Sequence, residues 1–164
     1  MWVGLSFILM LCCSVAATAQ TVNVDRIQIK IYGIYEGNIS KTEQTPTGIA
    51  LDIVANHQLV KQTTTVPARL GLRFDFEYLV VGTPQDAEVP LKFVTIFPKQ
   101  GVRPPKANGP VYRNESARTK RVGRESYRDY GFDDEWELVP GTWTIQIWYQ
   151  ERKLAEKSFT VVKP

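Results

Sequence analysis

The sequence contains very little cysteine. Its 164 residues include two cysteines, Cys12 and Cys13, and both lie in an N-terminal segment that we expect to be removed. The remaining chain would then have no disulfide, no thiol nucleophile and no thiolate metal site. We therefore expect a fold that is held together by side-chain packing alone.

Motifs that carry catalysis are also missing. There is one histidine, His57, and the chain has no G-x-S-x-G, G-x-x-x-x-G-K or G-x-G-x-x-G sequence. A nucleophile–histidine–acid arrangement needs an orienting carboxylate. Asp52 precedes His57 by five residues, which places the two on opposite faces of a regular strand. We expect His57 to lie in a turn or to face solvent, and we predict no catalytic residue and no cofactor.

The N-terminus lacks charge, because no charged side chain lies between residues 1 and 24. Its apolar run, Val3 to Val15, is about 13 residues long, whereas a bilayer span needs roughly 20. The run is followed by Ala17-Thr18-Ala19, an arrangement of small residues that signal peptidase accepts. We predict a signal peptide over residues 1–19 and a secreted or periplasmic protein that does not span the membrane after cleavage.

Apolar and polar residues alternate with a period of two through most of the remaining chain, which is typical of half-buried strands. In residues 70–81 the residues predicted to face inward are Leu70, Leu72, Phe74, Phe76 and Tyr78, and those predicted to face outward include Arg73, Asp75 and Glu77. In residues 49–60, Leu51 and Ile53 are predicted to alternate against Asp52. Further strands are expected at residues 25–35, 91–97, 127–138, 142–149 and 154–162, with a short edge strand at 111–112.

These segments predict an all-β protein, because no segment has the 3.6-residue period of an amphipathic helix. The strand count and spacing indicate an immunoglobulin-like antiparallel β-sandwich of seven or eight strands, formed as a single domain by residues 20–164. The predicted core consists of Leu72, Phe74, Phe76, Leu138, Trp143, Ile145, Ile147 and Phe159.

The C-terminal part of the chain carries a resemblance to a known family. Residues 136–145 read Trp-Glu-Leu-Val-Pro-Gly-Thr-Trp-Thr-Ile, and residues 153–161 read Lys-Leu-Ala-Glu-Lys-Ser-Phe-Thr-Val. This pattern resembles a family of short secreted bacterial immunoglobulin-like β-sandwich domains of unknown function, most strongly over residues 127–162. The resemblance implies the sandwich fold and a bacterial source. It implies no catalytic residue.

Acidic residues cluster near position 130, as Asp129, Asp133, Asp134, Glu135 and Glu137. Their spacing is not that of an EF-hand calcium loop. We interpret the cluster as a solvated turn and predict no metal site, and we interpret Asp75 and Glu77 as ordinary surface. A metal-dependent or acid/base hydrolase with a site built from His57 and residues 129–137 is kept as the alternative function.

Residues 98–128 are predicted to form one long basic loop. They contain several prolines and glycines, and nine basic side chains stand against two acidic ones, a net charge of +7 on a chain whose total is +3. A field of this sign favours anionic partners. The candidate anion-contacting residues are Arg113, Arg118, Lys120, Arg121, Arg124 and Arg128.

The sequence therefore favours an exported, non-enzymatic binding or structural module of the cell envelope. Its expected partner is an envelope protein or an anionic envelope component, because export argues against a nucleic acid. Sandwich domains bind through their end loops or by adding a strand at an exposed sheet edge.

Overall fold

The computed structural model describes residues 21–45 and 49–164, so the predicted signal peptide lies outside the described residues. Within them the chain forms nine strands and one short 3-10 helix, with no α-helix. The elements are β1 (Asn23–Gln44), β2 (Ala50–Lys61), β3 (Thr65–Pro67), β4 (Arg73–Thr83), β5 (Glu88–Ile96), β6 (Arg113–Arg121), β7 (Glu125–Gly131), η1 (Glu135–Glu137), β8 (Gly141–Tyr149) and β9 (Arg152–Val162).

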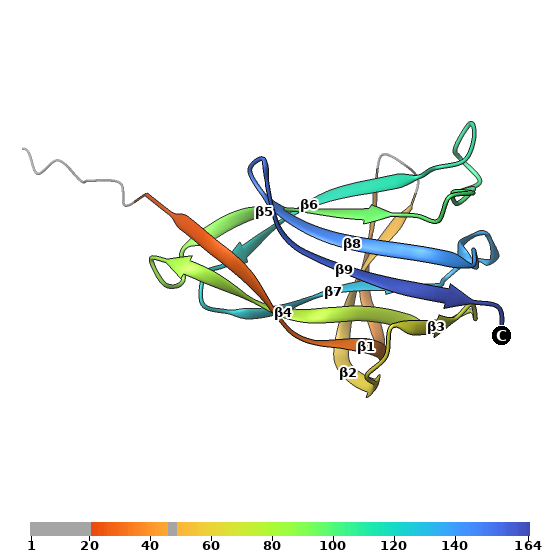
Figure 1. The fold of residues 1–164 in the computed structure, drawn as a ribbon, viewed down its shortest axis with the longest axis horizontal. Coiled ribbons are helices and arrows are strands. Elements are labelled where there is room, and N and C mark those ends of the chain that lie inside the picture. The colour runs from red at the N-terminus through yellow and green to blue at the C-terminus, as the bar shows by residue number, and fades with distance from the viewer. Residues whose placement is uncertain (1–20, 46–48) are drawn as a thin grey trace, which may run out of the picture.

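The strands form two sheets that pack face to face (Figure 1). One sheet has the order β2-β1-β4-β7 and the other β3-β9-β8-β5-β6. All pairings between neighbouring strands are antiparallel except the one between β3 and β9. The predicted β-sandwich is confirmed, with nine strands in place of seven or eight, and the additional strands include the three-residue β3.

Aromatic side chains fill the space between the sheets around Trp143, which is completely buried. Its ring contacts those of Phe74, Phe97, Tyr130 and Phe132, with ring centroids 5.0–6.0 Å apart. Edge-on contacts of this kind add to the free energy gained by burying apolar area. The indole nitrogen of Trp143 donates a hydrogen bond to the carbonyl of Val139, so burial leaves no polar atom of this ring unpaired.

The eight predicted core residues all face the core, although one of them is only partly buried. Leu138 is half-buried and packs against the core, and the other seven are buried: Leu72, Phe74, Phe76, Trp143, Ile145, Ile147 and Phe159. The prediction for Leu70 is wrong, because 47% of this residue is exposed. Leu70 precedes β4, which begins at Arg73, so the alternation of side chains along that strand does not extend to it.

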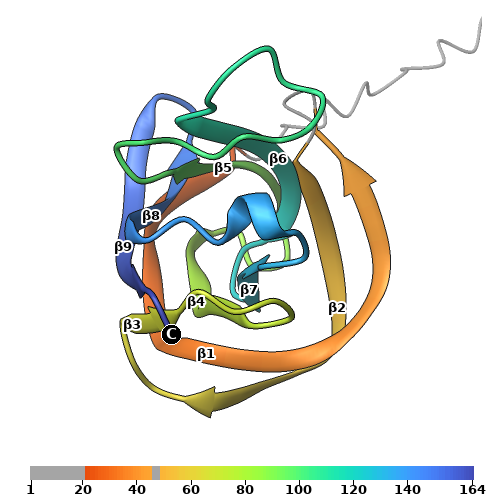
Figure 2. The same ribbon diagram turned by 90° about the vertical axis from the view of Figure 1, so that its right-hand side faces the viewer.

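The longest strand, β1, belongs to two pairings. Its first half, to Tyr35, pairs with β4, and its second half, from Ile34, pairs with β2. Beyond the end of β4 the β1–β2 ribbon curls around β7 and rises toward β6 (Figure 2). An ion pair of 2.7 Å between Arg118 of β6 and Glu43 of β1 joins the ribbon to the opposite sheet. The ribbon thereby covers the side of the sandwich between its edge strands β6 and β7.

The prediction of one continuous loop over residues 98–128 is wrong for much of its length. Residues 113–121 form β6, which pairs with β5 along its whole length, and β7 begins at Glu125. Every residue of β6 except Ala117 is polar or charged, and the strand lies at a sheet edge, so its sequence lacks the apolar period of a covered strand. Val111 forms a single bridge with Val102, and Tyr112 precedes β6. No described helix has the length and apolarity needed to cross a membrane.

Candidate functional site

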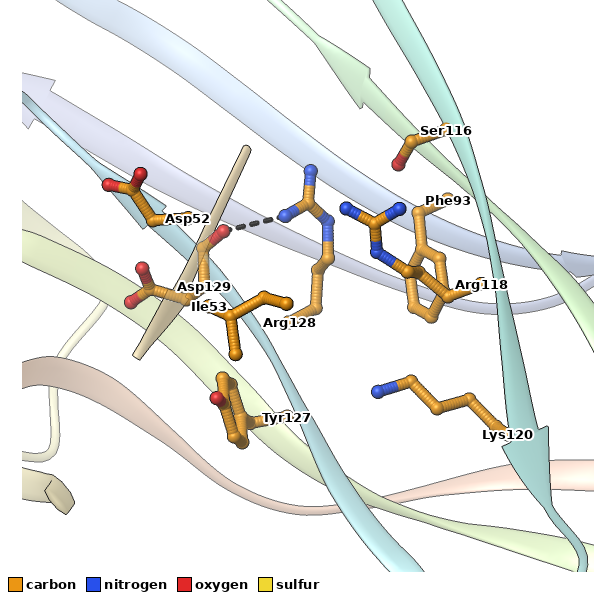
Figure 3. Close-up of a pocket in the computed structure, with 9 residues that line it drawn as sticks. All are labelled: Asp52, Ile53, Phe93, Ser116, Arg118, Lys120, Tyr127, Arg128 and Asp129. Atoms are coloured by element: carbon orange, nitrogen blue, oxygen red, sulfur yellow. Dashed lines mark hydrogen bonds between the residues drawn. The ribbon is translucent and has the colours of Figure 1, made fainter. Parts of the chain in front are cut away.

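A pocket of about 160 Å³ opens where the ribbon meets the sandwich side (Figure 3). Strands β2, β5, β6 and β7 all contribute to its wall, so it depends on the curl of the β1–β2 ribbon. The lining residues are Asp52, Ile53, Phe93, Ser116, Arg118, Lys120, Tyr127, Arg128 and Asp129. Polar and charged groups predominate among them, in contrast to the aromatic core between the sheets.

A β-bulge in β2 decides which of its side chains face the site. The pairing of β1 with β2 shifts between Glu36 and Asn38, opposite Asn56, whose φ is 55°. The extra residue changes the phase of the alternation, so that Asp52, Val54 and His57 all lie on the covered face. The expectation that Asp52 and His57 occupy opposite faces is therefore wrong.

Ile53 does alternate with Asp52, but the apolar residue faces outward: Ile53 is 38% exposed, whereas the side chain of Asp52 is 4% exposed. Asp52 faces inward because it pairs with Arg73 of β4. Arg73 donates hydrogen bonds of 2.7 Å to Asp52 and to Asp129 and lies 3.4 Å from Asp133. A buried guanidinium with carboxylate partners at this distance holds Asp52 inward, against the hydrophobic pattern of β2.

The network shifts the protonation of its members. Burial by itself lowers the pKa of Arg73, but Asp129 and Asp52 outweigh it and raise that pKa, so the guanidinium is charged. Burial raises the pKa of Asp52, but hydrogen bonds from Thr42 and Arg73 outweigh this effect and hold that pKa below its usual value. Burial raises the pKa of Asp133 to about 6 despite the charge of Arg73.

His57 is enclosed, so the expectation of a histidine in a turn or facing solvent is wrong. Its side chain is 7% exposed and its ring is sandwiched between Tyr35 and Tyr127, with centroids 4.1 and 4.3 Å away. Burial lowers the pKa of His57, an effect that the nearby Glu77 opposes. The neutral imidazole is thus the form that this environment favours.

Asp75 lies beside His57 and is completely buried, so its interpretation as ordinary surface is wrong. The ribbon covers the outer face of β4, where an uncovered sheet would meet water. Oδ1 accepts backbone hydrogen bonds from Phe76 and Arg128, and Oδ2 lies 3.4 Å from Nε2 of His57. Burial and the charge of Asp129 raise the pKa of Asp75 well above its usual value.

Three of the six predicted anion-contacting residues meet in the pocket: Arg118, Lys120 and Arg128 (Figure 3). Burial lowers the pKa values of Lys120 and Arg128, and the charge of Arg118 lowers both further. Lys120 donates a hydrogen bond of 2.7 Å to Ser126. Nη1 of Arg128 donates to the carbonyl of Asp129, and its buried Nε has no hydrogen-bond partner among the described residues.

The other three predicted contacts lie outside this pocket. Each makes an exposed ion pair with a nearby acid, as Arg113–Glu115, Arg121–Glu88 and Arg124–Asp86. Pairs of this kind contribute little to stability or recognition because water screens them. The structure therefore separates the three basic residues that line the pocket from the three that form exposed ion pairs. The spacing of these residues along the chain does not predict this separation.

The acidic cluster divides in a similar way, and its interpretation as a solvated turn is wrong for Asp129 and Glu137, which are both buried. Glu137 accepts hydrogen bonds from the Tyr130 hydroxyl and from the backbone N–H groups of Asp133 and Asp134. It organises the turn before β8. Burial raises the pKa of Glu137 to about 7, although these hydrogen bonds oppose the shift.

Asp75, Tyr35 and Tyr127 were missed as site residues by sequence reasoning. In β4, Asp75 lies directly opposite Asp129 of β7. Two carboxylates placed directly across a sheet repel each other unless other groups compensate them. That pairing becomes visible only once the strand register is known.

A second hollow, at one end of the sandwich, is lined by Gln100, Gly101, Arg103, Glu135, Trp136 and Val139. It contains one cation and one acid, with no convergence of like charges. We therefore take the pocket beside β7 as the candidate site.

Comparison with solved structures supports the fold. An immunoglobulin-like protein from Pseudomonas aeruginosa (PA1606) is 29% identical, with a TM-score of 0.60, over 90% of this chain and 100% of that one. A β-D-glucoside glucohydrolase from Trichoderma reesei matches at 7% identity and a TM-score of 0.37, over 84% of this chain and 19% of that one. A β-glucosidase from Erythrobacter marinus matches at 12% identity and a TM-score of 0.34, over 82% of this chain and 16% of that one.

The TM-scores of the two glucosidase matches are too low to indicate a common fold with this chain. No curated protein sequence matches the chain significantly. A family model matches residues 23–161, which span both sheets and every residue of the pocket. The resemblance expected from the C-terminal strands is thereby confirmed, and the chain belongs to the family described as domain of unknown function (DUF3859).

Proposed function

We propose that this protein is an exported, non-enzymatic binding module of the cell envelope, and that it binds an anionic group in the pocket beside β7. The observation that carries the proposal is the convergence of Arg118, Lys120 and Arg128 on one small pocket. Cations that repel each other are costly to assemble unless an anion compensates them. An anion is therefore the ligand class that this arrangement favours.

Arg128 supports the proposal most strongly. Its guanidinium lies 5.8 Å from the centroid of the Phe93 ring, and its burial lowers the pKa of Arg128. The unpartnered Nε offers a donor to a ligand oxygen. A charged donor that lacks a partner in a buried place costs free energy, and a phosphate or carboxylate oxygen would recover that cost.

Arg118 and Lys120 supply the remaining contacts. Both come from β6, two residues apart, so their side chains lie on the same face of that strand. The guanidinium of Arg118 and the carboxylate of Glu43 are each about one-third exposed, so a ligand anion can replace Glu43. Lys120 makes one neutral hydrogen bond, which leaves further donors of its ammonium group available.

The two acids in the pocket wall do not cancel this preference. Asp52 and Asp129 each form a 2.7 Å ion pair with Arg73, which is not among the residues that line the pocket. The charge of Arg73 therefore reduces the negative potential of these two acids before a ligand enters. A volume of about 160 Å³ suits one phosphate or carboxylate headgroup with a short attachment. The expected ligand is an anionic envelope component or an acidic group of an envelope protein.

The test is calorimetric titration with inorganic phosphate at low ionic strength. We compare the wild type with a pocket variant, Arg118→Gln with Lys120→Gln, and with a matched control, Arg121→Gln with Arg124→Gln. The control removes the same charge from exposed ion pairs. We expect at least tenfold weaker binding for the pocket variant, no change for the control, and weaker binding at higher salt. Equal loss in both variants, or no binding by the wild type, would contradict the proposal.

A further inference from the structure

We propose that His57, Asp75 and Asp129 form a site for one divalent transition-metal ion of the Zn²⁺ class. One potential ligand atom from each of the three residues lies within 4.8 Å of the other two. The proposal shares Asp129 with the wall of the anion pocket, but it needs no anion there and does not rest on the proposed function. The residues come from β2, β4 and β7, so the curled ribbon is what completes the set.

Each residue presents one atom without a hydrogen-bond partner. These atoms are Nε2 of His57, Oδ2 of Asp75 and Oδ1 of Asp129, and all three are buried. Buried polar atoms are nearly always paired in folded proteins, so three orphans together need a common explanation. A metal ion bound by all three atoms satisfies them at once.

The other polar atoms of these side chains already have neighbours that fix their orientation. Oδ1 of Asp75 accepts two backbone N–H groups, and Oδ2 of Asp129 accepts from Nε of Arg73. Nδ1 of His57 lies 3.9 Å from a carboxylate oxygen of Glu77. Metal-binding histidines commonly face a carboxylate with their second nitrogen, which leaves the first nitrogen to bind the metal.

The imidazole plane is also fixed before any ion arrives. Tyr35 stacks on one face of the His57 ring and Tyr127 on the other, at interplanar angles of 13° and 15°. Stacking on both faces keeps the plane of the imidazole ring from tilting. The preorganisation reduces the entropy that a metal ion would otherwise have to overcome.

The distance between the His57 and Asp75 atoms fits a metal ion better than a hydrogen bond. Nε2 and Oδ2 are 3.4 Å apart, beyond the usual range of 2.7–3.2 Å for an N–H···O bond. Two ligands on a tetrahedral zinc ion, each about 2.0–2.1 Å from the metal, lie about 3.3 Å from each other. The Asp129 oxygen lies within 4.8 Å of the other two atoms, so a small inward movement of its carboxylate completes such a geometry.

The donor set selects the class of ion. Calcium and magnesium prefer sites made only of oxygen atoms, whereas an imidazole nitrogen favours zinc and its transition-metal neighbours. Three protein ligands leave a fourth tetrahedral position for water or another small ligand. Arg73 and the Arg128 backbone remain as supports for the two carboxylates, with no need to leave them.

The test uses the protein after treatment with a chelator and desalting, titrated with Zn²⁺ alone. We expect one ion per chain by elemental analysis, a rise of several degrees in Tm, and a tetrahedral d–d absorption when Co²⁺ replaces Zn²⁺. Mg²⁺ and Ca²⁺ at the same concentration should leave Tm unchanged. Failure to retain Zn²⁺ after desalting, with no change in Tm, would overturn the proposal.

Two variants remove one ligand each while keeping the shape of the site. His57→Phe preserves a ring between the tyrosines, and Asp75→Asn preserves the acceptor of the two backbone hydrogen bonds. Each should lose the Co²⁺ spectrum and at least tenfold in Zn²⁺ affinity. The control Asp133→Asn changes a partly exposed partner of Arg73 and should bind normally. Unchanged binding by both ligand variants would also overturn the proposal, and far-UV circular dichroism with a cooperative thermal transition checks that each variant is folded.

Discussion

Nε2 of His57 and Oδ2 of Asp75 face each other at 3.4 Å, and neither has a hydrogen-bond partner. The two residues belong to strands that do not pair, β2 and β4. They meet because the β1–β2 ribbon curls over the outer face of its own sheet. This curl converts a face that would be wet in a flat sandwich into a buried polar site.

Asp75→Asn should stabilise the metal-free protein. The substitution removes one of two buried carboxylates that lie opposite each other, Asp75 and Asp129, and keeps the acceptor Oδ1. The new amide can also donate to Nε2 of His57. We expect a gain of roughly 1–3 kcal/mol in the free energy of unfolding. Urea denaturation measures it, and a loss of stability would show that the carboxylate is already well compensated.

Arg73→Met should destabilise the protein by about 3–5 kcal/mol, the usual effect of removing one partner of a buried ion pair. Three carboxylates depend on this guanidinium: Asp52, Asp129 and Asp133. The matched control is Arg121→Met, which breaks an exposed pair with Glu88 and should cost under about 1 kcal/mol. Equal effects of the two substitutions in chemical denaturation would refute this account of the network.

Trp143→Ala should cost about 3–5 kcal/mol, as truncations of large buried aromatic residues do. The ring is completely buried and contacts four other aromatic rings. Thermal or chemical denaturation of the variant measures this cost. A loss under about 1 kcal/mol would mean that the cavity collapses, which is incompatible with a rigidly packed core.

The free energy of unfolding should fall between about pH 4.5 and pH 7 because of Glu137. Burial raises the pKa of this carboxyl from 4.5 to about 7, so in this window the folded protein keeps a proton that the unfolded chain releases. Stability from this group is therefore complete below pH 4.5 and is lost as pH rises through 7, by up to about 3 kcal/mol. Carbon NMR of the Glu137 carboxyl should show a midpoint near 7, and a midpoint near 4.5 would contradict the prediction.

The sequence predicted the sandwich because its core strands are regular. In the first parts of β4 and β8, up to Tyr78 and Ile147, apolar and polar residues alternate in the sequence. Phe74, Phe76, Trp143 and Ile145 could therefore be assigned to the core from their positions alone. Their environment is set by the strand period and by apolar character, which are both local properties of the sequence.

The site could not be predicted in the same way, since its residues follow long-range geometry. The phase of β2 is reversed by a bulge at Asn56, and the inward position of Asp52 is decided by Arg73, 21 residues away. Composition put Arg118, Lys120 and Arg128 among the candidates, but it could not show that these three meet in one pocket while Arg113, Arg121 and Arg124 lie outside it. The separation requires the register of β6 and the course of the ribbon.

The central claim, that the pocket beside β7 binds an anion, is tested most directly by an amide NMR titration of the protein with inorganic phosphate. The account predicts saturable shifts concentrated at Ser116, Arg118, Tyr127 and Arg128, which line the pocket. Shifts confined to Arg113, Arg121 and Arg124, or no saturable shifts at all, would contradict it.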